Sequence, residues 1–124
     1  MKEWEVLGLS PGPHFMAFFR RALAGRGILT TKEAGYRPQG TYVQVAGLPV
    51  RPHRPPTRSG RTIVYLSLED ETGMLDVTVF ENIYKRYGHI LFGYPLPPLV
   101  IGGYIEHRGT LAFLRAEKVE PMRV

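Results

Sequence analysis

The sequence of 124 residues contains no cysteine. This absence excludes disulfide scaffolds, thiol catalysis and cysteine-ligated zinc, and it fits a reducing cytoplasm. No uninterrupted apolar stretch approaches the roughly 18 residues that a membrane-spanning helix needs, and no signal-peptide pattern opens the chain. The sequence therefore predicts a soluble, unprocessed cytoplasmic protein without a membrane partner.

Acidic residues are missing from one segment of the chain. Residues 51–61 (RPHRPPTRSGR) contain four arginines and no Asp or Glu, within a chain of formal net charge +5. A basic surplus favours polyanionic partners such as nucleic acid, although a charge of this size also serves solubility alone. The clustering in one segment, rather than the total, favours a nucleic-acid partner.

Motifs for catalysis and for metal binding are also missing. The four histidines, at positions 14, 53, 89 and 107, are widely spaced and form no ligand pattern. The acidic residues Glu69, Asp70, Glu71 and Asp76 straddle a predicted turn, where Asp commonly makes local hydrogen bonds. We find no nucleophile elbow and no phosphate-binding loop. The sequence predicts no metal, no cofactor and no enzymatic activity.

The second part of the chain alternates apolar and polar residues with a period of two, which is typical of strands. Proline excludes a central strand in 51–61, which is therefore predicted to be a long exposed loop. Strands are predicted from Thr41 onward and over 62–69, 74–80, 99–107 and 110–118, with a tight turn at 70–73 and an amphipathic helix over 81–92. Five strands with a helix between the third and fourth predict an all-β, five-stranded OB-fold barrel. An SH3-like barrel is the alternative, but it normally lacks that helix.

The first 40 residues follow a helical period instead. Phe15, Phe18, Phe19 and Leu23 recur at helical spacing, which predicts a helix over roughly 13–25. A short helical turn is expected after Leu29, and residues 35–40 are expected to be a linker. We therefore divide the chain into an N-terminal helical extension, 1–40, and an OB-fold nucleic-acid-binding domain, 41–124.

OB-folds bind oligonucleotides across strands two and three, where cations follow the phosphates and flat side chains stack on bases. The candidate contacts are Arg51, His53, Arg54, Arg58 and Arg61 on the first loop, Tyr65 and Phe80 facing outward on strands two and three, and His107 and Arg108 beside the last hairpin. Exposed aromatic side chains can equally cover the rim of a small barrel. Tyr84 and Tyr87 are interpreted as helix packing.

Several segments resemble one protein family. The segment from Glu3 to His14 (EWEVLGLSPGPH) is similar to a pattern that precedes the OB domain of the bacterial C-family DNA polymerase III alpha subunit, although Phe15 replaces its usual proline. The blocks TYVQVAGLPVRP, TIVYLSLEDETGMLDVTVFENIYKRY and LVIGGYIEHRGTLAFLRAEKVE resemble that OB domain, most closely in its error-prone branch.

The resemblance implies a single-stranded DNA-binding module that accompanies a polymerase, with Tyr65 and the loop arginines on its binding face. The polymerase aspartates and the phosphoesterase domain of the family have no counterpart here, so the chain is not expected to polymerise DNA. Met1 and the motif-complete length favour a free-standing relative over a fragment.

We therefore expect non-catalytic binding of single-stranded DNA in replication or repair, with little sequence preference because stacking and charge do not read base edges. A DNA polymerase or repair complex is the expected protein partner. Two alternatives remain open at this point: an RNA- or tRNA-binding module, and a protein-interaction or oligomerisation module that uses Phe15, Phe18 and Phe19. The oligomeric state is also open.

Overall fold

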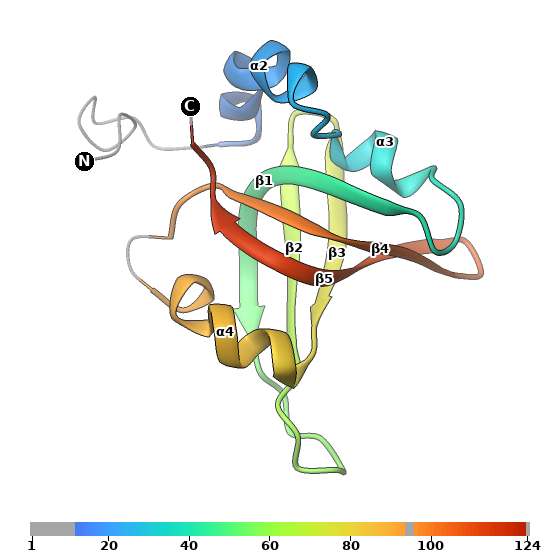
Figure 1. The fold of residues 1–124 in the computed structure, drawn as a ribbon, viewed down its shortest axis with the longest axis vertical. Coiled ribbons are helices and arrows are strands. Elements are labelled where there is room, and N and C mark those ends of the chain that lie inside the picture. The colour runs from blue at the N-terminus through green and yellow to red at the C-terminus, as the bar shows by residue number, and fades with distance from the viewer. Residues whose placement is uncertain (1–11, 94–95, 124) are drawn as a thin grey trace.

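The barrel in Figure 1, a computed structural model that describes residues 12–93 and 96–123, is formed by five strands that close in the order β1-β2-β3-β5-β4. The strands are β1 (Tyr42–His53), β2 (Val64–Asp70), β3 (Gly73–Val79), β4 (Leu99–Arg108) and β5 (Leu111–Pro121). β3 and β5 run parallel, and the other neighbouring pairs are antiparallel. The predicted OB-fold barrel is confirmed.

The first strand is longer than expected. Its first half, Tyr42–Gly47, pairs with β4, and its second half continues to His53 along β2. The pairing with β2 is irregular between Val50 and His53, and Arg51 has a positive φ of 51°. Such a bulge tolerates Pro52, which cannot donate a ladder hydrogen bond. The prediction of a loop over 51–61 is therefore wrong for residues 51–53, and the loop spans 54–63.

The β2–β3 hairpin follows its predicted alternation. Val64, Leu66 and Leu68 are buried in the core, whereas Tyr65 lies on the outer face. Gly73 closes the turn with φ 150°, a conformation that favours glycine. The hairpin thus presents alternate side chains of two adjacent strands on one outer surface.

One end of the barrel is covered by α4 (Glu81–Leu91), the helix predicted between the third and fourth strands (Figure 1). Ile83 and Leu91 are buried in the core, and Tyr84 and Tyr87 pack against it, as interpreted from the sequence. None of the helices among the described residues is long and apolar enough to cross a membrane.

The other end of the barrel is covered by the N-terminal segment. The single helix expected over 13–25 is instead a 3₁₀ helix, η1 (Pro13–Phe19), followed by α2 (Arg20–Gly25). No side chain caps the start of η1, and 3₁₀ geometry is common at helix N-termini. A second apolar cluster joins this segment to the barrel: Met16, Leu23, Ile28, Ala46, Val100 and Met122. The family-like residues Glu3–Pro11 lie outside the described residues.

The short helix α3 (Thr31–Gly35) begins with a capping box. The Thr30 hydroxyl accepts from the Glu33 backbone N–H (3.0 Å), and the Glu33 carboxylate accepts from the Thr30 N–H (2.9 Å). These hydrogen bonds satisfy donors that a helix start otherwise leaves unpaired, and they hold the pKa of Glu33 below its ordinary value. The chain therefore enters α3 at a fixed position beside the β2–β3 turn.

Asp70 connects α3 to that turn. Its carboxylate is 2% exposed and accepts from the Thr31 backbone N–H (2.8 Å) and the Thr72 hydroxyl (2.7 Å), among other donors. Burial alone would raise the pKa of Asp70, but the hydrogen bonds from Thr31 and Thr72 outweigh it and the pKa lies below its ordinary value. The turn is thus fixed by a buried, fully bonded carboxylate.

Candidate nucleic-acid interface

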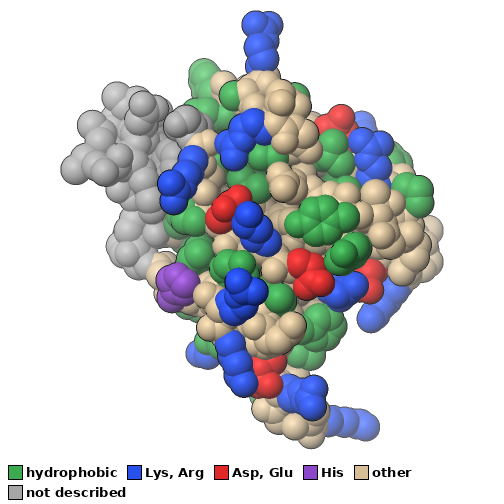
Figure 2. Space-filling view, in the orientation of Figure 1, with side chains coloured by type: hydrophobic (Ala, Val, Ile, Leu, Met, Phe, Trp, Pro, Cys, Tyr) green, Lys and Arg blue, Asp and Glu red, His purple; other side chains and the backbone are tan. Residues whose placement is uncertain are grey.

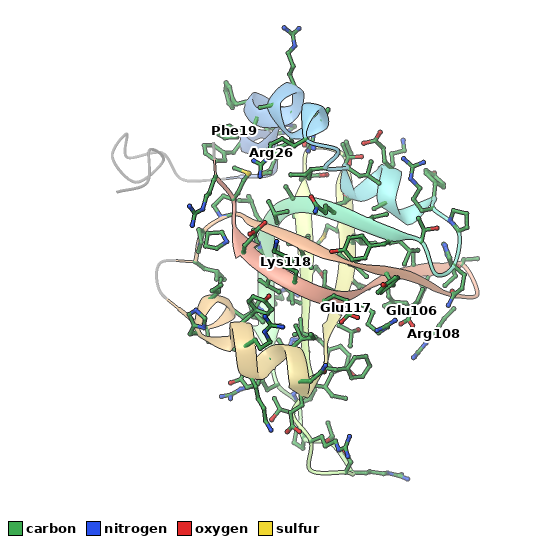
Figure 3. All side chains as sticks on the ribbon, viewed as in Figure 1. Phe19, Arg26, Glu106, Arg108, Glu117 and Lys118 are labelled. Atoms are coloured by element: carbon green, nitrogen blue, oxygen red, sulfur yellow. The ribbon has the colours of Figure 1, made fainter. Side chains whose placement is uncertain are left out.

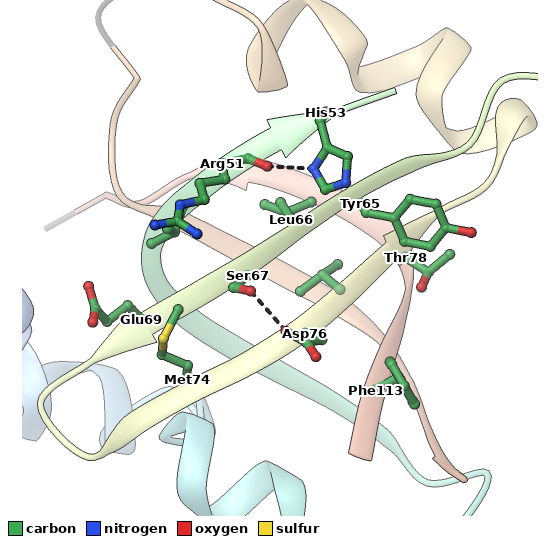
Figure 4. Close-up of a pocket in the computed structure, with 12 residues that line it drawn as sticks. Arg51, His53, Tyr65, Leu66, Ser67, Glu69, Met74, Asp76, Thr78 and Phe113 are labelled. Atoms are coloured by element: carbon green, nitrogen blue, oxygen red, sulfur yellow. Dashed lines mark hydrogen bonds between the residues drawn. The ribbon is translucent and has the colours of Figure 1, made fainter. Parts of the chain in front are cut away.

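The outer surface of the β2–β3 hairpin contains a groove of about 650 Å³ (Figure 4). Its lining comes from β1, β2, β3 and β5, and consists of Val50, Arg51, His53, Tyr65, Leu66, Ser67, Glu69, Met74, Asp76, Val77, Thr78 and Phe113. The groove is on the barrel face where the sequence predicted oligonucleotide contacts. It brings together three of the predicted residues: Arg51, His53 and Tyr65.

His53 and Tyr65 form a pair of flat rings at one end of this groove. Their centroids are 5.9 Å apart and their planes differ by 31°, and Tyr65 is 38% exposed. His53 Nδ1 donates to the backbone carbonyl of Arg51 (2.8 Å), which fixes the imidazole beside the phenol ring. Two flat rings side by side at the surface, tilted by 31° to each other, offer faces on which a base can stack.

The bulge in β1 brings the side chain of Arg51 into the lining of the groove. Arg51 lies where the β1–β2 pairing is irregular, so its side chain lines the groove although the residue precedes the loop. His53 pairs with Tyr65 across the two strands, which explains why their rings meet. The local pairing thus brings one arginine and two rings into the lining of one groove, and single-stranded nucleic acid binds to such combinations of cations and flat side chains.

Phe113 is the groove aromatic that sequence reasoning missed. It pairs with Asp76 because β5 runs parallel to β3 and closes the barrel. Its outward orientation could have been found from the alternation with buried Leu114, but its place beside β3 depends on the closure, which local periodicity does not reveal. The sequence analysis also did not assign the polar groove residues Ser67, Glu69 and Thr78 to the site.

The predicted loop arginines lie in different places and contact different parts of the protein. Arg54 turns towards α4, where it donates to the Tyr84 hydroxyl (2.7 Å) and lies 5.0 Å from the centroid of the Phe92 ring. Arg61 lines a separate hollow beside the start of α4, and Arg58 is exposed on the loop. Figure 2 shows basic side chains at the tip of this projecting loop. Only Arg51 of the predicted arginines lines the groove.

Phe80 differs from its predicted position. β3 ends at Val79, and Phe80 is the N-cap residue of α4 with φ −75° and ψ 165°. The start of the helix turns its side chain away from the β2–β3 face, so it lines the same separate hollow as Arg61 and Lys85. Phe80 is exposed as predicted, but its predicted place on strand three is wrong.

His107 and Arg108 lie at the end of β4, beside the turn into β5. The backbone N–H of His107 donates to Gln39 Oε1 (2.6 Å) and its ring Nε2 donates to the carbonyl of Arg37 (2.7 Å), so it faces the linker. Arg108, labelled in Figure 3, lies over the ring of Phe113 at 5.6 Å. Of the two residues, Arg108 is thus the one beside the groove.

The outer face of β4 and β5 has a different charge pattern. Arg115 pairs with Glu106 (3.4 Å) and Glu117 (3.5 Å), and Lys118 lies 3.9 Å from Glu120. Figure 2 shows this face with basic and acidic side chains interspersed. These cations are already neutralised within the protein, which makes this face a weaker phosphate site than the groove.

Metal-ligating side chains do not cluster in the described parts of the chain. Within 12–93 and 96–123, no three His, Asp or Glu residues are placed so that they could hold a metal ion.

Comparison with known proteins shows which family this chain is related to. The chain is 55% identical over 109 residues to the error-prone DNA polymerase of Symbiobacterium thermophilum, covering 88% of this chain and 10% of that polymerase. This chain is a homologue of one segment of error-prone DNA polymerase. The polymerase of Anaeromyxobacter dehalogenans is 37% identical over 120 residues, or 97% of this chain and 10% of that protein. The predicted family resemblance is confirmed.

The chain spans about a tenth of the length of these error-prone DNA polymerases. No protein-family model matches the sequence. Among solved structures, RecG bound to a three-way DNA junction superposes with a TM-score of 0.61 at 15% identity, over 78% of this chain and 13% of RecG. At that identity the superposition shows a shared fold alone.

Proposed function

We propose that residues 41–124 form a non-catalytic single-stranded DNA-binding domain, acting in the cytoplasm beside a DNA polymerase or repair complex. The observation that carries the proposal is the groove in which Arg51 accompanies the paired rings of His53 and Tyr65. A guanidinium attracts phosphate, and an exposed ring pair stacks on unpaired bases. The homology to a polymerase segment supports DNA as the nucleic acid.

Within this proposal the described part of the extension, residues 12–40, supports the groove instead of binding DNA. This part packs on the barrel through Met16, Leu23 and Ile28, and Arg20 binds the β2–β3 turn. Phe15 and Phe19 pack against the same cluster, whereas Phe18 is 84% exposed. Most of the apolar side that an oligomerisation module would use is thus occupied within the chain.

Fluorescence anisotropy of a labelled single-stranded DNA oligonucleotide tests the proposal. The native chain should bind, and Tyr65→Ala should weaken binding about tenfold or more, because stacking contributes roughly 1–3 kcal/mol per base. Tyr36→Ala is the matched control, because Tyr36 is 79% exposed at the end of α3 and does not line the groove. Equal weakening by both variants, or by neither, would contradict the proposal.

Competitors in the same experiment separate the alternatives. Unlabelled single-stranded DNA should displace the probe more effectively than duplex DNA, because bases stacked in a duplex cannot reach the His53–Tyr65 pair. RNA or tRNA that displaces the probe more effectively than DNA of the same length would favour the RNA-binding alternative. Absence of binding at low salt to any of these nucleic acids would reject both the DNA-binding proposal and the RNA-binding alternative.

A further inference from the structure

Two acidic side chains, Asp76 and Glu69, line the proposed DNA groove, and each belongs to a cross-strand pair of the β2–β3 hairpin. Three cross-strand pairs follow one another along it: Tyr65 with Thr78, Ser67 with Asp76, and Glu69 with Met74. Figure 4 shows the ring pair at one end of this row and Glu69 with Met74 at the hairpin end. A base stacked on Tyr65 therefore has Asp76 as its neighbour in the next row, about 7 Å along the strand.

These two carboxylates lack a cation. Among the described residues, Glu69 and Asp76 have no ion-pair partner, a state they share with Glu33 and Glu81 outside the groove, whereas the other acidic residues lie in ion pairs: Asp70, Glu71, Glu106, Glu117 and Glu120. Asp76 Oδ1 accepts one hydrogen bond from the Ser67 hydroxyl (2.9 Å), which leaves most of its acceptor capacity open. A phosphate placed over these groups would be repelled, so the hairpin half of the groove suits base edges better than backbone.

Bases differ in what they offer to a carboxylate. Cytosine, adenine and guanine carry exocyclic amino groups and thymine carries none, and pairing of Asp or Glu with the cytosine amino group is an established mode of base readout. Thymine presents two carbonyl oxygens with a single ring N–H between them. A carboxylate that approaches this N–H is therefore repelled by the carbonyl oxygens on both sides. A carboxylate beside a stacking platform therefore favours amino-bearing bases.

We propose that Asp76, with Glu69 beyond it, makes the groove select cytosine- and adenine-containing single strands over thymine-containing ones. This inference rests on the proposed DNA-binding function and adds a base preference to it. It also departs from the sequence-based expectation of little preference, because that expectation considered only stacking and charge. Ser67 is a positioning residue in this account, since its hydroxyl orients the Asp76 carboxylate towards the open groove.

The test compares oligo(dC), oligo(dA) and oligo(dT) of equal length, about ten nucleotides, by anisotropy with the whole chain. We expect dC and dA to bind at least about tenfold tighter than dT, the scale of one charge-assisted hydrogen bond. Asp76→Asn should reduce this ratio towards one by strengthening dT binding, because an amide donates as well as accepts. Its oxygen can still accept from Ser67, so the variant is expected to fold.

The matched control removes the same charge elsewhere. Glu117→Gln, on the β4–β5 face, should leave the ratio of dC to dT affinity unchanged. The effect of each oligonucleotide's own stiffness on its affinity is the same for every variant, so it cancels when the ratios are compared. If Asp76→Asn strengthens all three oligonucleotides equally, the carboxylate only repels phosphate and the inference is overturned. Equal binding of all three by the native chain overturns it too and leaves the proposed function standing, whereas binding of none rejects both.

Discussion

Arg20 holds Glu71 with two hydrogen bonds across 51 positions of the chain: Nε to Oε2 at 2.8 Å and Nη2 to Oε1 at 2.7 Å. The same guanidinium lies 3.4 Å from Asp70. These hydrogen bonds lower the pKa of Glu71 and raise that of Arg20. The α2 helix is thereby fastened to the turn of the hairpin on which the groove is built.

We expect Arg20→Met to destabilise the protein by about 1–3 kcal/mol, because it removes two hydrogen bonds from the partly buried Glu71 and the nearby cation from the buried Asp70. Arg21→Met is the matched control, since Arg21 is exposed and adjacent in sequence. Urea unfolding followed by circular dichroism measures both. Equal midpoints for the two variants would show that the Arg20 pairing adds no stability.

Acid should destabilise the fold through the same cluster. The pKa values of Asp70, Glu71 and Glu33 are lower in the folded state than their ordinary values of 3.8, 4.5 and 4.5. The unfolded chain therefore takes up protons first, and stability declines as pH falls below about 4.5 and through the folded pKa values. The free energy of unfolding, measured at neutral pH and near pH 3, should fall on acidification.

Asp70→Asn separates the contribution of that residue. The variant should be less stable at neutral pH, because an amide cannot accept all the hydrogen bonds from Thr31 and Thr72. It should also lose less stability between neutral pH and pH 3 than the native chain, since one titrating group is gone. A steeper decline in the variant would contradict this assignment.

Close packing at Gly103 gives a prediction about the barrel itself. A Cβ at this position would collide with the backbone carbonyl of Arg115, where the β4–β5 pairing shifts register. Gly103→Ala should therefore cost about 2 kcal/mol or more, because backbone must move. Gly25→Ala is the control, since a Cβ there meets nothing within 4 Å. Similar thermal midpoints for both would argue against this packing.

Sequence reasoning predicted the barrel because its signals are local. The alternation of Val64, Leu66 and Leu68, and the turn at Gly73, are contained in short stretches, and both are confirmed. The bulge at Arg51 escaped prediction because proline-rich sequence looks the same in a loop and in a bulged strand end. The capping pattern of Thr30 and Glu33 was present in the sequence and would have predicted the start of α3.

The site was harder to predict than the fold. Alternation alone placed Tyr65 on the outer face, but the neighbours of that residue come from three other strands. Phe113 reaches the groove only because β5 closes against β3, and Phe80 leaves it because β3 ends at Val79, one residue before the predicted end of the strand. These outcomes depend on long-range closure and on the residue at which a strand ends, which local periodicity does not determine.

Arg51 should differ from the loop arginines in its effect on DNA binding. Arg51→Ala should weaken binding and reduce the slope of log affinity against log salt by about 0.7, the value for one phosphate contact on a single strand. Arg58→Ala should change both less, because Arg58 is exposed on the loop outside the groove. A salt series by anisotropy measures both slopes. A larger change for Arg58 would indicate that the DNA phosphates follow the loop instead of the groove.

Amide chemical-shift mapping tests the central claim most directly. A ¹⁵N-labelled sample of this 14.0 kDa chain is titrated with a short single-stranded DNA oligonucleotide and followed residue by residue. The account predicts that the largest shifts fall on Arg51, His53, Tyr65, Thr78 and Phe113, the residues that line the groove. Shifts concentrated on the β4–β5 face, or no shifts at saturating oligonucleotide, would contradict it.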